Sequence, residues 1–211
     1  SLSVKELKEI GYFPQAVINY LSRVGHTISD NELRNIHELS SVFNIGNIST
    51  SPSKIDHTQL NFWQKNVIES ISIEELSSWL ESSLEDLPKD VNKDSFVGLI
   101  RDNITFPADA VRYLKNLFIN PLDSEKEVED LIKQTGSHFF KTAEKIIENN
   151  WGDWSKTMKI IGEETGAKGK SLFMPIRASI TGQISGPELD QVIEVMGLER
   201  VLRRLQEASS L

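Results

Sequence analysis

Serine followed three residues later by glutamate recurs along this chain, just before hydrophobic residues with helical spacing. In this arrangement, called a capping box, the two side chains accept hydrogen bonds from backbone N–H groups that the first turn of a helix leaves unpaired. No stretch shows the alternation of polar and hydrophobic residues that is typical of a strand. The sequence therefore predicts an all-α fold. Three of these pairs are Ser3 with Glu6, Ser29 with Glu32, and Ser72 with Glu75.

Proline, glycine and hydrophobic spacing complete the expected set of helices. Proline is favoured in the first turn of a helix, and glycine closes the last turn in a left-handed conformation. The most amphipathic helix is expected from Ser72 to Leu87, ending at Pro88. Expected starts lie at or near Ser3, Pro14, Ser29, Leu60, Ser72, Ser95, Ala108, Ser124, Phe139, Asp153, Pro175 and Glu188, and expected ends at Gly11, Gly25, Pro88, Gly136, Gly166 and Gly182. On the second helix the expected inward face is Val17, Tyr20, Leu21 and Val24.

Two stretches interrupt the helical pattern. Residues 42–57 are rich in glycine, asparagine, serine and proline, and residues 119–123 contain an Asn-Pro pair. A chain of 211 residues is long enough for one to three small domains, each with a hydrophobic core. We therefore expect three helical layers or subdomains, with breaks near residues 45–57 and 119–123.

The composition limits the classes of function. The chain has no cysteine, so disulfide scaffolds, thiolate zinc sites and cysteine nucleophiles are excluded. No secretory signal and no membrane-spanning stretch is recognisable, and we expect a cytoplasmic protein. A formal net charge of −8 argues against binding nucleic acid by bulk charge, although the segment from Lys168 onward carries six Lys/Arg and five Asp/Glu. Any contact with nucleic acid must therefore come from a few placed residues.

No pattern of catalytic or metal-binding residues emerges. Gly169-Lys170-Ser171 resembles the end of a phosphate-binding loop, but Glu164 stands where that loop needs glycine. We expect no catalytic residue, no metal site and no cofactor site in this chain. The scattered histidines and the tryptophans are expected to be structural, with the tryptophans packing in cores; they are His26, His37, His57, His138, Trp63, Trp79, Trp151 and Trp154.

The segment from Lys168 to Arg204 contains the best candidate binding site. A helix that starts near Pro175 and stops at Thr181-Gly182 is followed by a second helix opened by Ser185-Gly186-Pro187-Glu188. A helix N-terminus carries unpaired N–H groups and suits phosphates or nucleotide edges. Local physics alone favours the simpler alternative of a helical hairpin that closes a domain.

Motifs at both ends of the chain point to a family. They comprise the opening SVKELKEIGYFPQAVINYLSRVGHT, then Lys54-Ile55-Asp56 with Gln59-Leu60 and Asn66, and finally Pro175, Arg177, Thr181-Gly182, Gly186-Pro187, Gly197 and Arg203-Arg204-Leu205. Over residues 1–207 the chain resembles the C-terminal, tRNA-binding half of bacterial glutamyl-tRNA synthetase, most weakly at residues 70–165. It departs from the family at Ile55, where an aromatic residue is usual, and at Gln59, where lysine is usual.

The resemblance implies an architecture and a partner. It implies a stem-contact domain at residues 1–65 and two helical anticodon-binding subdomains at 66–118 and 119–211. Neither class I signature, of the HIGH or the KMSKS type, occurs in the sequence. The chain is therefore expected to be an excised part of a monomeric glutamate–tRNA ligase, inactive alone. It would bind tRNA(Glu), with tRNA(Gln) as a further candidate, while ATP and Mg²⁺ would bind in the absent catalytic domain.

The resemblance also implies site residues. The terminal motif of the family places Arg177, Gly186, Pro187 and Leu189 against the last two anticodon bases. The arginine that recognises the first anticodon base has its counterpart at Arg101 or at Asn103, and asparagine there would relax discrimination. The alternative function is an all-α protein-interaction scaffold without an RNA role, which accounts better for the acidic charge but not for the end motifs.

Overall fold

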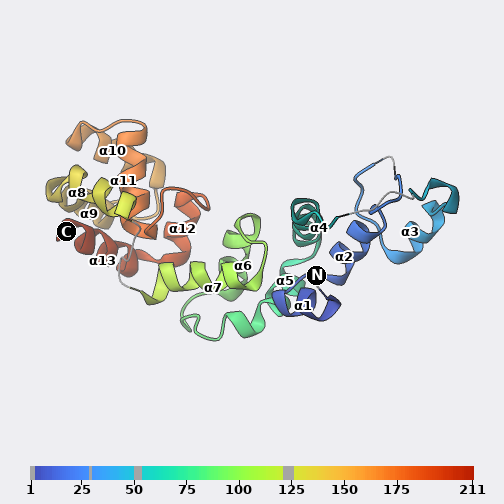
Figure 1. Ribbon diagram of the computed structural model, residues 1–211. Helices are drawn as coiled ribbons and strands as arrows, with labels where there is room; N and C mark the ends of the chain where they lie inside the picture. Colours follow the sequence, from blue (N-terminus) through green and yellow to red (C-terminus); the bar gives the residue numbers. More distant parts are fainter. Residues whose placement is uncertain (1–2, 29, 50–53, 121–125) are drawn as a thin grey trace. The chain divides into compact units, whose positions relative to one another are not determined.

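The computed structural model describes residues 3–28, 30–49, 54–120 and 126–211, and Figure 1 shows these ranges as a series of helices. They contain no strand, only an isolated bridge between His26 and Ile48, so the all-α prediction is confirmed. No helix within these ranges is long and hydrophobic enough to cross a membrane. The chain forms two compact units, which we describe separately.

Unit 1 comprises the described residues up to Ser83 together with Arg101–Ala110. Its α-helices are α1 (Val4–Ile10), α2 (Pro14–Leu21), α3 (Ile36–Val42), α4 (His57–Ser70) and α5 (Ile73–Trp79), followed in part by α7 (Pro107–Leu114). Its 3-10 turns are η1 (Ile45–Asn47), η2 (Glu81–Ser83) and η3 (Arg101–Asn103).

Unit 2 comprises Leu84–Ile100 and Val111–Leu211. It contains α6 (Lys93–Ile100), the rest of α7, the π-helical turn η4 (Lys115–Ile119), α8 (Lys126–Thr135), α9 (Ser137–Asn149), α10 (Trp154–Thr165), α11 (Lys170–Thr181), α12 (Leu189–Met196) and α13 (Leu198–Ser209). The predicted division into domains at residues 1–65, 66–118 and 119–211 stays a prediction.

Local capping signals set several helix ends as predicted. At α1 the Ser3 hydroxyl accepts from the N–H of Glu6 at 3.2 Å, and Gly11 ends the helix in the left-handed conformation. At α5 the Ser72 hydroxyl accepts from the N–H of Glu75, also at 3.2 Å. The expected cap at Ser124 lies outside the described residues, and α8 is described from Lys126.

The third predicted helix begins later than the sequence indicated. Ser29 lies outside the described residues, and α3 starts at Ile36, capped by Asn35 together with Glu38. The preceding segment is held by α2 instead. The buried amide of Asn19 donates to the carbonyl of Arg34 at 2.7 Å and accepts from its N–H at 3.0 Å. Both backbone groups of Arg34 are thus hydrogen-bonded to Asn19, and the segment before α3 is not helical.

The same amide explains the inward face of α2. Ala16, Asn19 and Tyr20 are buried, whereas Leu21 and Val24, which we expected to face inward, are exposed. The helix ends at Leu21, and Gly25 is left-handed (φ +73°) but closes a following turn. The prediction followed hydrophobicity alone, whereas the buried face of α2 includes the hydrogen-bonded amide of Asn19.

The helix from Ser72 is shorter than predicted. It ends at Trp79 and passes into the 3-10 turn η2, in which the N–H of Ser83 donates to the carbonyl of Leu80 at 2.9 Å. Leu80 and Leu84 are buried all the same. Serines have a low helix propensity, and hydrophobic spacing does not distinguish a continued helix from a turn that buries the same leucines.

The core of unit 1 is organised around a buried amide. Gln64 on α4 is fully buried beside Trp63. Its Oε1 accepts from the N–H of Phe13 at 2.9 Å, and its Nε2 donates to the carbonyls of Gly11 and Thr105, each at 3.1 Å. One side chain thereby pairs three backbone groups from two separate segments. The hydrophobic residues around it are Tyr12, Ala16, Tyr20, Leu60, Trp63 and Val67.

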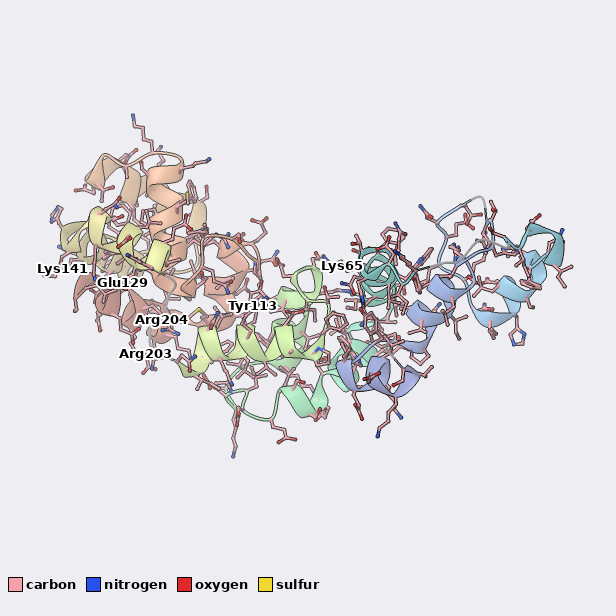
Figure 2. The ribbon with its side chains drawn as sticks, in the orientation of Figure 1. Lys65, Tyr113, Glu129, Lys141, Arg203 and Arg204 are labelled. Carbon is pink, nitrogen blue, oxygen red and sulfur yellow. The ribbon has the colours of Figure 1, made fainter. Side chains whose placement is uncertain are left out.

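The core of unit 2 includes the packing of α9 against α13. It also buries Arg204, which is 1% exposed and donates to the carbonyl of Asn116 in the π-helical turn at 2.5 Å and to Glu207 at 3.2 Å. Burial lowers the pKa of this guanidinium. Figure 2 labels Arg204 and its neighbour Arg203, which is exposed.

The tryptophans do not all pack in cores as predicted. Trp63 is buried, while Trp79 and Trp154 are half-buried. Trp151 is 41% exposed, so the prediction was wrong for this residue. It lies in the turn between α9 and α10, where helical spacing does not apply.

Replacing Gln64 by alanine should destabilise unit 1. Removal of the amide leaves three backbone groups without their partner, and we expect the free energy of unfolding to fall by about 3 kcal/mol. Urea denaturation followed by tryptophan fluorescence measures this. Gln59→Ala, at an exposed position of the same helix, is the control, and equal stability of the two variants would contradict the role of Gln64.

Acid titration tests the segment before α3. Hydrogen bonds from Arg34, and then from the N–H of Glu32, hold the pKa of Asp30 at about 2, below its ordinary value of 3.8. The stabilisation is complete above pH 3.8 and is lost as the pH falls toward 2. Carboxyl NMR should show the pKa of Asp30 rising in Arg34→Ala and unchanged in Arg200→Ala. An unchanged pKa in Arg34→Ala would refute this pairing.

Candidate nucleic-acid interface

The candidate interface is built on α11, which begins earlier than predicted. The sequence placed its start near Pro175, whereas the helix begins at Lys170, after Gly169 in a positive-φ conformation (φ +52°). The N–H of Phe173 donates to the carbonyl of Gly169 at 3.0 Å, which establishes the first turn. Pro175 therefore lies inside the helix, where it lacks an N–H for the carbonyl of Ser171 and its ring crowds that carbonyl.

The end of α11 agrees with the sequence. Gly182 adopts the left-handed conformation (φ +67°), and its N–H donates to the carbonyl of Ala178. The hydroxyl of Thr181 lies 2.8 Å from the carbonyl of Arg177 and also accepts from the N–H of Gln183 at 3.1 Å. The chain thus leaves α11 along a fixed path into the turn that precedes α12.

Arg177 fixes the other end of this turn. Its Nη1 donates to the carbonyl of Pro187 at 2.7 Å. The side chain is half-buried, and this is its one hydrogen bond to the residues that the structure describes. A guanidinium has five N–H donors in a planar fork, so donors remain for a ligand.

Gly186 presents exposed backbone beside that guanidinium. Its φ of +144° is a conformation that residues with a side chain rarely adopt. A Cβ at this position would lie 3.7 Å from the hydroxyl of Tyr113 and 3.9 Å from Nη1 of Arg177, which are ordinary contacts. The backbone conformation therefore requires glycine, while the space would admit a methyl group. Tyr113 was not identified from the sequence, where nothing in its surroundings relates it to Gly186.

Pro187 and Leu189 are buried rather than displayed. Leu189 is 6% exposed and begins α12, and Pro187 is buried just before it. In this structure their hydrophobic groups belong to the core of unit 2. The four residues Arg177, Gly186, Pro187 and Leu189 come together at one turn, with the guanidinium and the glycine backbone accessible and the two hydrophobic side chains beneath.

Arg101 in unit 1 is engaged with backbone. Its Nε donates to the carbonyl of Ile68 at 3.0 Å, and its Nη2 donates to the carbonyls of Ile68, Glu69 and Ile71. These carbonyls lie at the end of α4, where the last turn of a helix has no internal donors. The positive charge also suits the negative end of the helix dipole. Arg101 thus caps α4.

Asn103, two residues later in the same 3-10 turn, is half-buried. Its amide makes no hydrogen bond to the residues that the structure describes. Of the two candidates for the first anticodon base, Asn103 therefore keeps its donors and acceptor, whereas those of Arg101 face α4. Both belong to unit 1, whereas the α11–α12 turn belongs to unit 2.

The other lysines and arginines from Lys168 onward fall into two groups: some lie close to an acidic side chain and some do not. Arg200 binds Asp90 at 2.9 Å and lowers the pKa of that carboxyl, and Arg203 and Arg204 lie close to Glu207. Lys168 and Lys170 are exposed at the start of α11. Within the part of the chain that the structure describes, these two lysines and Arg177 have no acidic partner. The net charge available to a polyanion is therefore small and localised.

The described ranges contain no group of three or more histidine, cysteine, aspartate or glutamate residues that could hold a metal ion. His37, His57 and His138 are exposed, and His26 is buried, with its Nε2 3.0 Å from the carbonyl oxygen of Asn44 and its ring stacked on Phe43.

The chain is similar in sequence to proteins of known families. Residues 72–209 match a family model described as an anticodon binding domain. The chain is 37% identical over 211 residues to glutamate–tRNA ligase 1 of Halorhodospira halophila, covering 100% of this chain and 44% of the relative. It is 34% identical over 207 residues to glutamate–tRNA ligase 2 of Nitrosococcus oceani, covering 98% and 44%. The chain thus spans less than half the length of these relatives.

Solved structures share the fold. A glutamate tRNA ligase from Elizabethkingia meningosepticum in complex with its amino acid superposes with a TM-score of 0.81 at 19% identity, over 97% of this chain and 42% of that one. A glutamate-tRNA synthetase from Elizabethkingia anophelis gives the same values. At this identity the match shows the fold alone.

Replacing Arg101 by methionine should destabilise unit 1, because the carbonyls at the end of α4 lose their donors while the hydrophobic part of the side chain is kept. We expect the free energy of unfolding to fall by about 2 kcal/mol. Lys89→Met, at an exposed position, is the control. If urea denaturation shows Arg101→Met to be as stable as the parent, Arg101 is not a structural cap.

Proposed function

The chain belongs to the anticodon-binding domain family, and from this premise we propose that it recognises the anticodon and stem of tRNA(Glu) for a glutamate–tRNA ligase. The observation that carries the proposal is the turn between α11 and α12, where Arg177 and the backbone of Gly186 are accessible together. The bases of an RNA loop are unstacked, and they are bound through their edges and faces. A fixed fork of donors beside a glycine backbone suits both kinds of contact.

Arg177 is proposed to contact two partners at once. Nη1 holds the carbonyl of Pro187, and the remaining N–H groups donate to an oxygen on the edge of an anticodon base. Because the first bond fixes the guanidinium before RNA arrives, little side-chain freedom is lost on binding. The buried Pro187 and Leu189 anchor the turn, and their contact with a base face is the part of the proposal that requires some movement of the turn.

Asn103 is the proposed contact for the first anticodon base, with Arg101 as the residue that positions its turn. The amide carries both donors and an acceptor, so it tolerates more than one base edge. The anticodons for glutamate and glutamine differ at the last base, so tRNA(Gln) would be a second substrate only if recognition at the α11–α12 turn were relaxed as well.

The proposed ligase reaction takes place outside these residues. The 211 residues carry neither signature of a class I catalytic domain, so we propose that ATP, Mg²⁺ and glutamate bind to a catalytic domain in cis. On this proposal the chain alone binds tRNA as a monomer and forms no ester bond. Because translation takes place in the cytoplasm, we propose that the complete enzyme is cytoplasmic.

Arg177→Ala should weaken binding of tRNA(Glu) about tenfold, the value of one lost base-edge contact. Arg177→Lys keeps the charge and a donor for Pro187 but not the fork, so it should also bind more weakly than the parent. Filter-binding titration at fixed salt measures both. Lys159→Ala removes an exposed charge of α10 and should bind as the parent does.

Two outcomes would refute the assignment. Unchanged affinity in Arg177→Ala, with an unchanged circular dichroism spectrum, would remove Arg177 from the site. Absence of any salt-sensitive tRNA binding by the parent chain would favour a protein-interaction scaffold, because contacts with phosphates depend on salt.

A further inference from the structure

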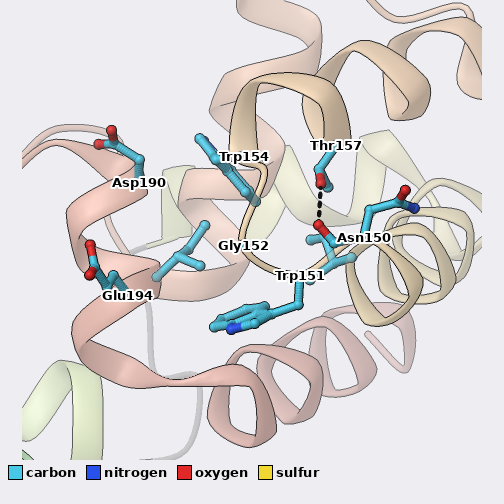
Figure 3. Close-up of a pocket in the computed structure, with 9 residues that line it drawn as sticks. Asn150, Trp151, Gly152, Trp154, Thr157, Asp190 and Glu194 are labelled. Carbon is cyan, nitrogen blue, oxygen red and sulfur yellow. Dashed lines mark hydrogen bonds between the residues drawn. The ribbon is translucent and has the colours of Figure 1, made fainter.

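A cavity of about 370 Å³ opens in unit 2, beside the turn between α9 and α10 and against α12. Its volume lies within the range of about 300–1,000 Å³ that is typical of small-molecule sites. Figure 3 shows two tryptophans and two carboxylates around it. The residues that line it are Ile147, Asn150, Trp151, Gly152, Trp154, Thr157, Asp190, Ile193 and Glu194.

Trp151 supplies an exposed aromatic ring on a rigid support. The ring is 41% exposed, and Gly152 follows it in the left-handed region (φ +95°). The hydroxyl of Thr157 lies 3.0 Å from the carbonyl oxygen of Asn150, a contact drawn in Figure 3, and 2.7 Å from that of Asp153. The turn is therefore held by hydrogen bonds of its own, and it carries a ring that is partly exposed to solvent.

Two carboxylates on one face of α12 give the cavity a negative charge. Asp190 and Glu194 are four residues apart, so they lie one above the other on the helix. Asp190 lies in the first turn of α12, where the helix dipole favours a negative charge. Its Oδ1 accepts a hydrogen bond from the N–H of Gln191 at 2.9 Å. Glu194 has no hydrogen bond or ion pair with the described residues. No lysine or arginine lines the cavity.

These carboxylates repel the phosphodiester backbone of RNA and favour a cation. We propose that the cavity binds a small compound with a guanidinium group. A guanidinium is planar and weakly hydrated, so its face can stack on the indole of Trp151 while its edge donates to Glu194 and Asp190. An ammonium group is strongly hydrated and lacks the flat face, so it fits this lining less well. The inference stands independently of the proposed recognition of tRNA.

Titration with n-butylguanidinium tests the proposal on the complete chain. Ligand-observed NMR should show saturable binding that n-butylammonium at the same concentration does not match. Trp151→Ala should weaken binding about tenfold through loss of the stacked ring, and Glu194→Gln about threefold through loss of an exposed charge. Affinity for tRNA(Glu) should be unchanged in both variants.

Matched controls separate the site from general effects. Phe173→Ala removes another exposed aromatic ring, and Glu199→Gln another exposed carboxylate, and both should bind n-butylguanidinium as the parent does. The proposal is overturned if the parent shows no saturable binding, or if n-butylammonium binds as tightly. It is also overturned if Trp151→Ala binds normally. Tighter binding of an acetyl-Gly-Arg-Gly-amide peptide would assign the cavity to a protein partner and overturn the small-compound assignment.

Discussion

Short helices leave many backbone groups unpaired, and this structure depends on a few side chains that pair them. The first and last turns of every helix lack internal partners. Gln64 pairs three backbone groups in unit 1, and Arg101 donates to the end of α4. In unit 2 Arg204 donates to the π-helical turn and Arg177 to the carbonyl before α12. Three of these four side chains are arginines. In this acidic protein, several positively charged groups therefore donate hydrogen bonds to carbonyls of the chain itself.

The same constraint limits how the chain can bind RNA. With a net charge of −8, the chain is not suited to holding a polyanion by its total charge. Arg177 differs from Arg101 and Arg204 because it makes one hydrogen bond to the described residues, so most of its N–H donors have no partner among them. On the proposed function, recognition depends on the position of one guanidinium and one glycine backbone rather than on total charge. The cavity beside α12 carries carboxylates instead of a guanidinium, so we expect it to bind a cation and not RNA.

The sequence predicts those features of the fold that depend on residues close together in the chain. Capping at Ser3, Ser72 and Asp153, and left-handed closure at Gly166 and Gly182, follow from hydrogen bonds within one turn, and all are observed. The contact of Asn19 with the backbone of Arg34, just before the late start of α3, joins distant residues and is not predicted. The early end of α5 in a 3-10 turn is local, but hydrophobic spacing does not distinguish it from a longer helix. At the candidate site the sequence identified Arg177 and Gly186 through a family motif. The nearby Tyr113 and the burial of Leu189 depend on tertiary packing, which no local pattern encodes.

The central claim is that the α11–α12 turn recognises anticodon bases. The most direct measurement compares the affinity of the chain for three tRNA(Glu) transcripts: the parent, one with its last two anticodon bases replaced, and one with its 3′ end removed. The account predicts that the anticodon replacement weakens binding by about tenfold for each base, as expected for lost base-edge contacts, while removal of the 3′ end has no effect. Equal affinity for the parent and the anticodon-replaced transcript would contradict it.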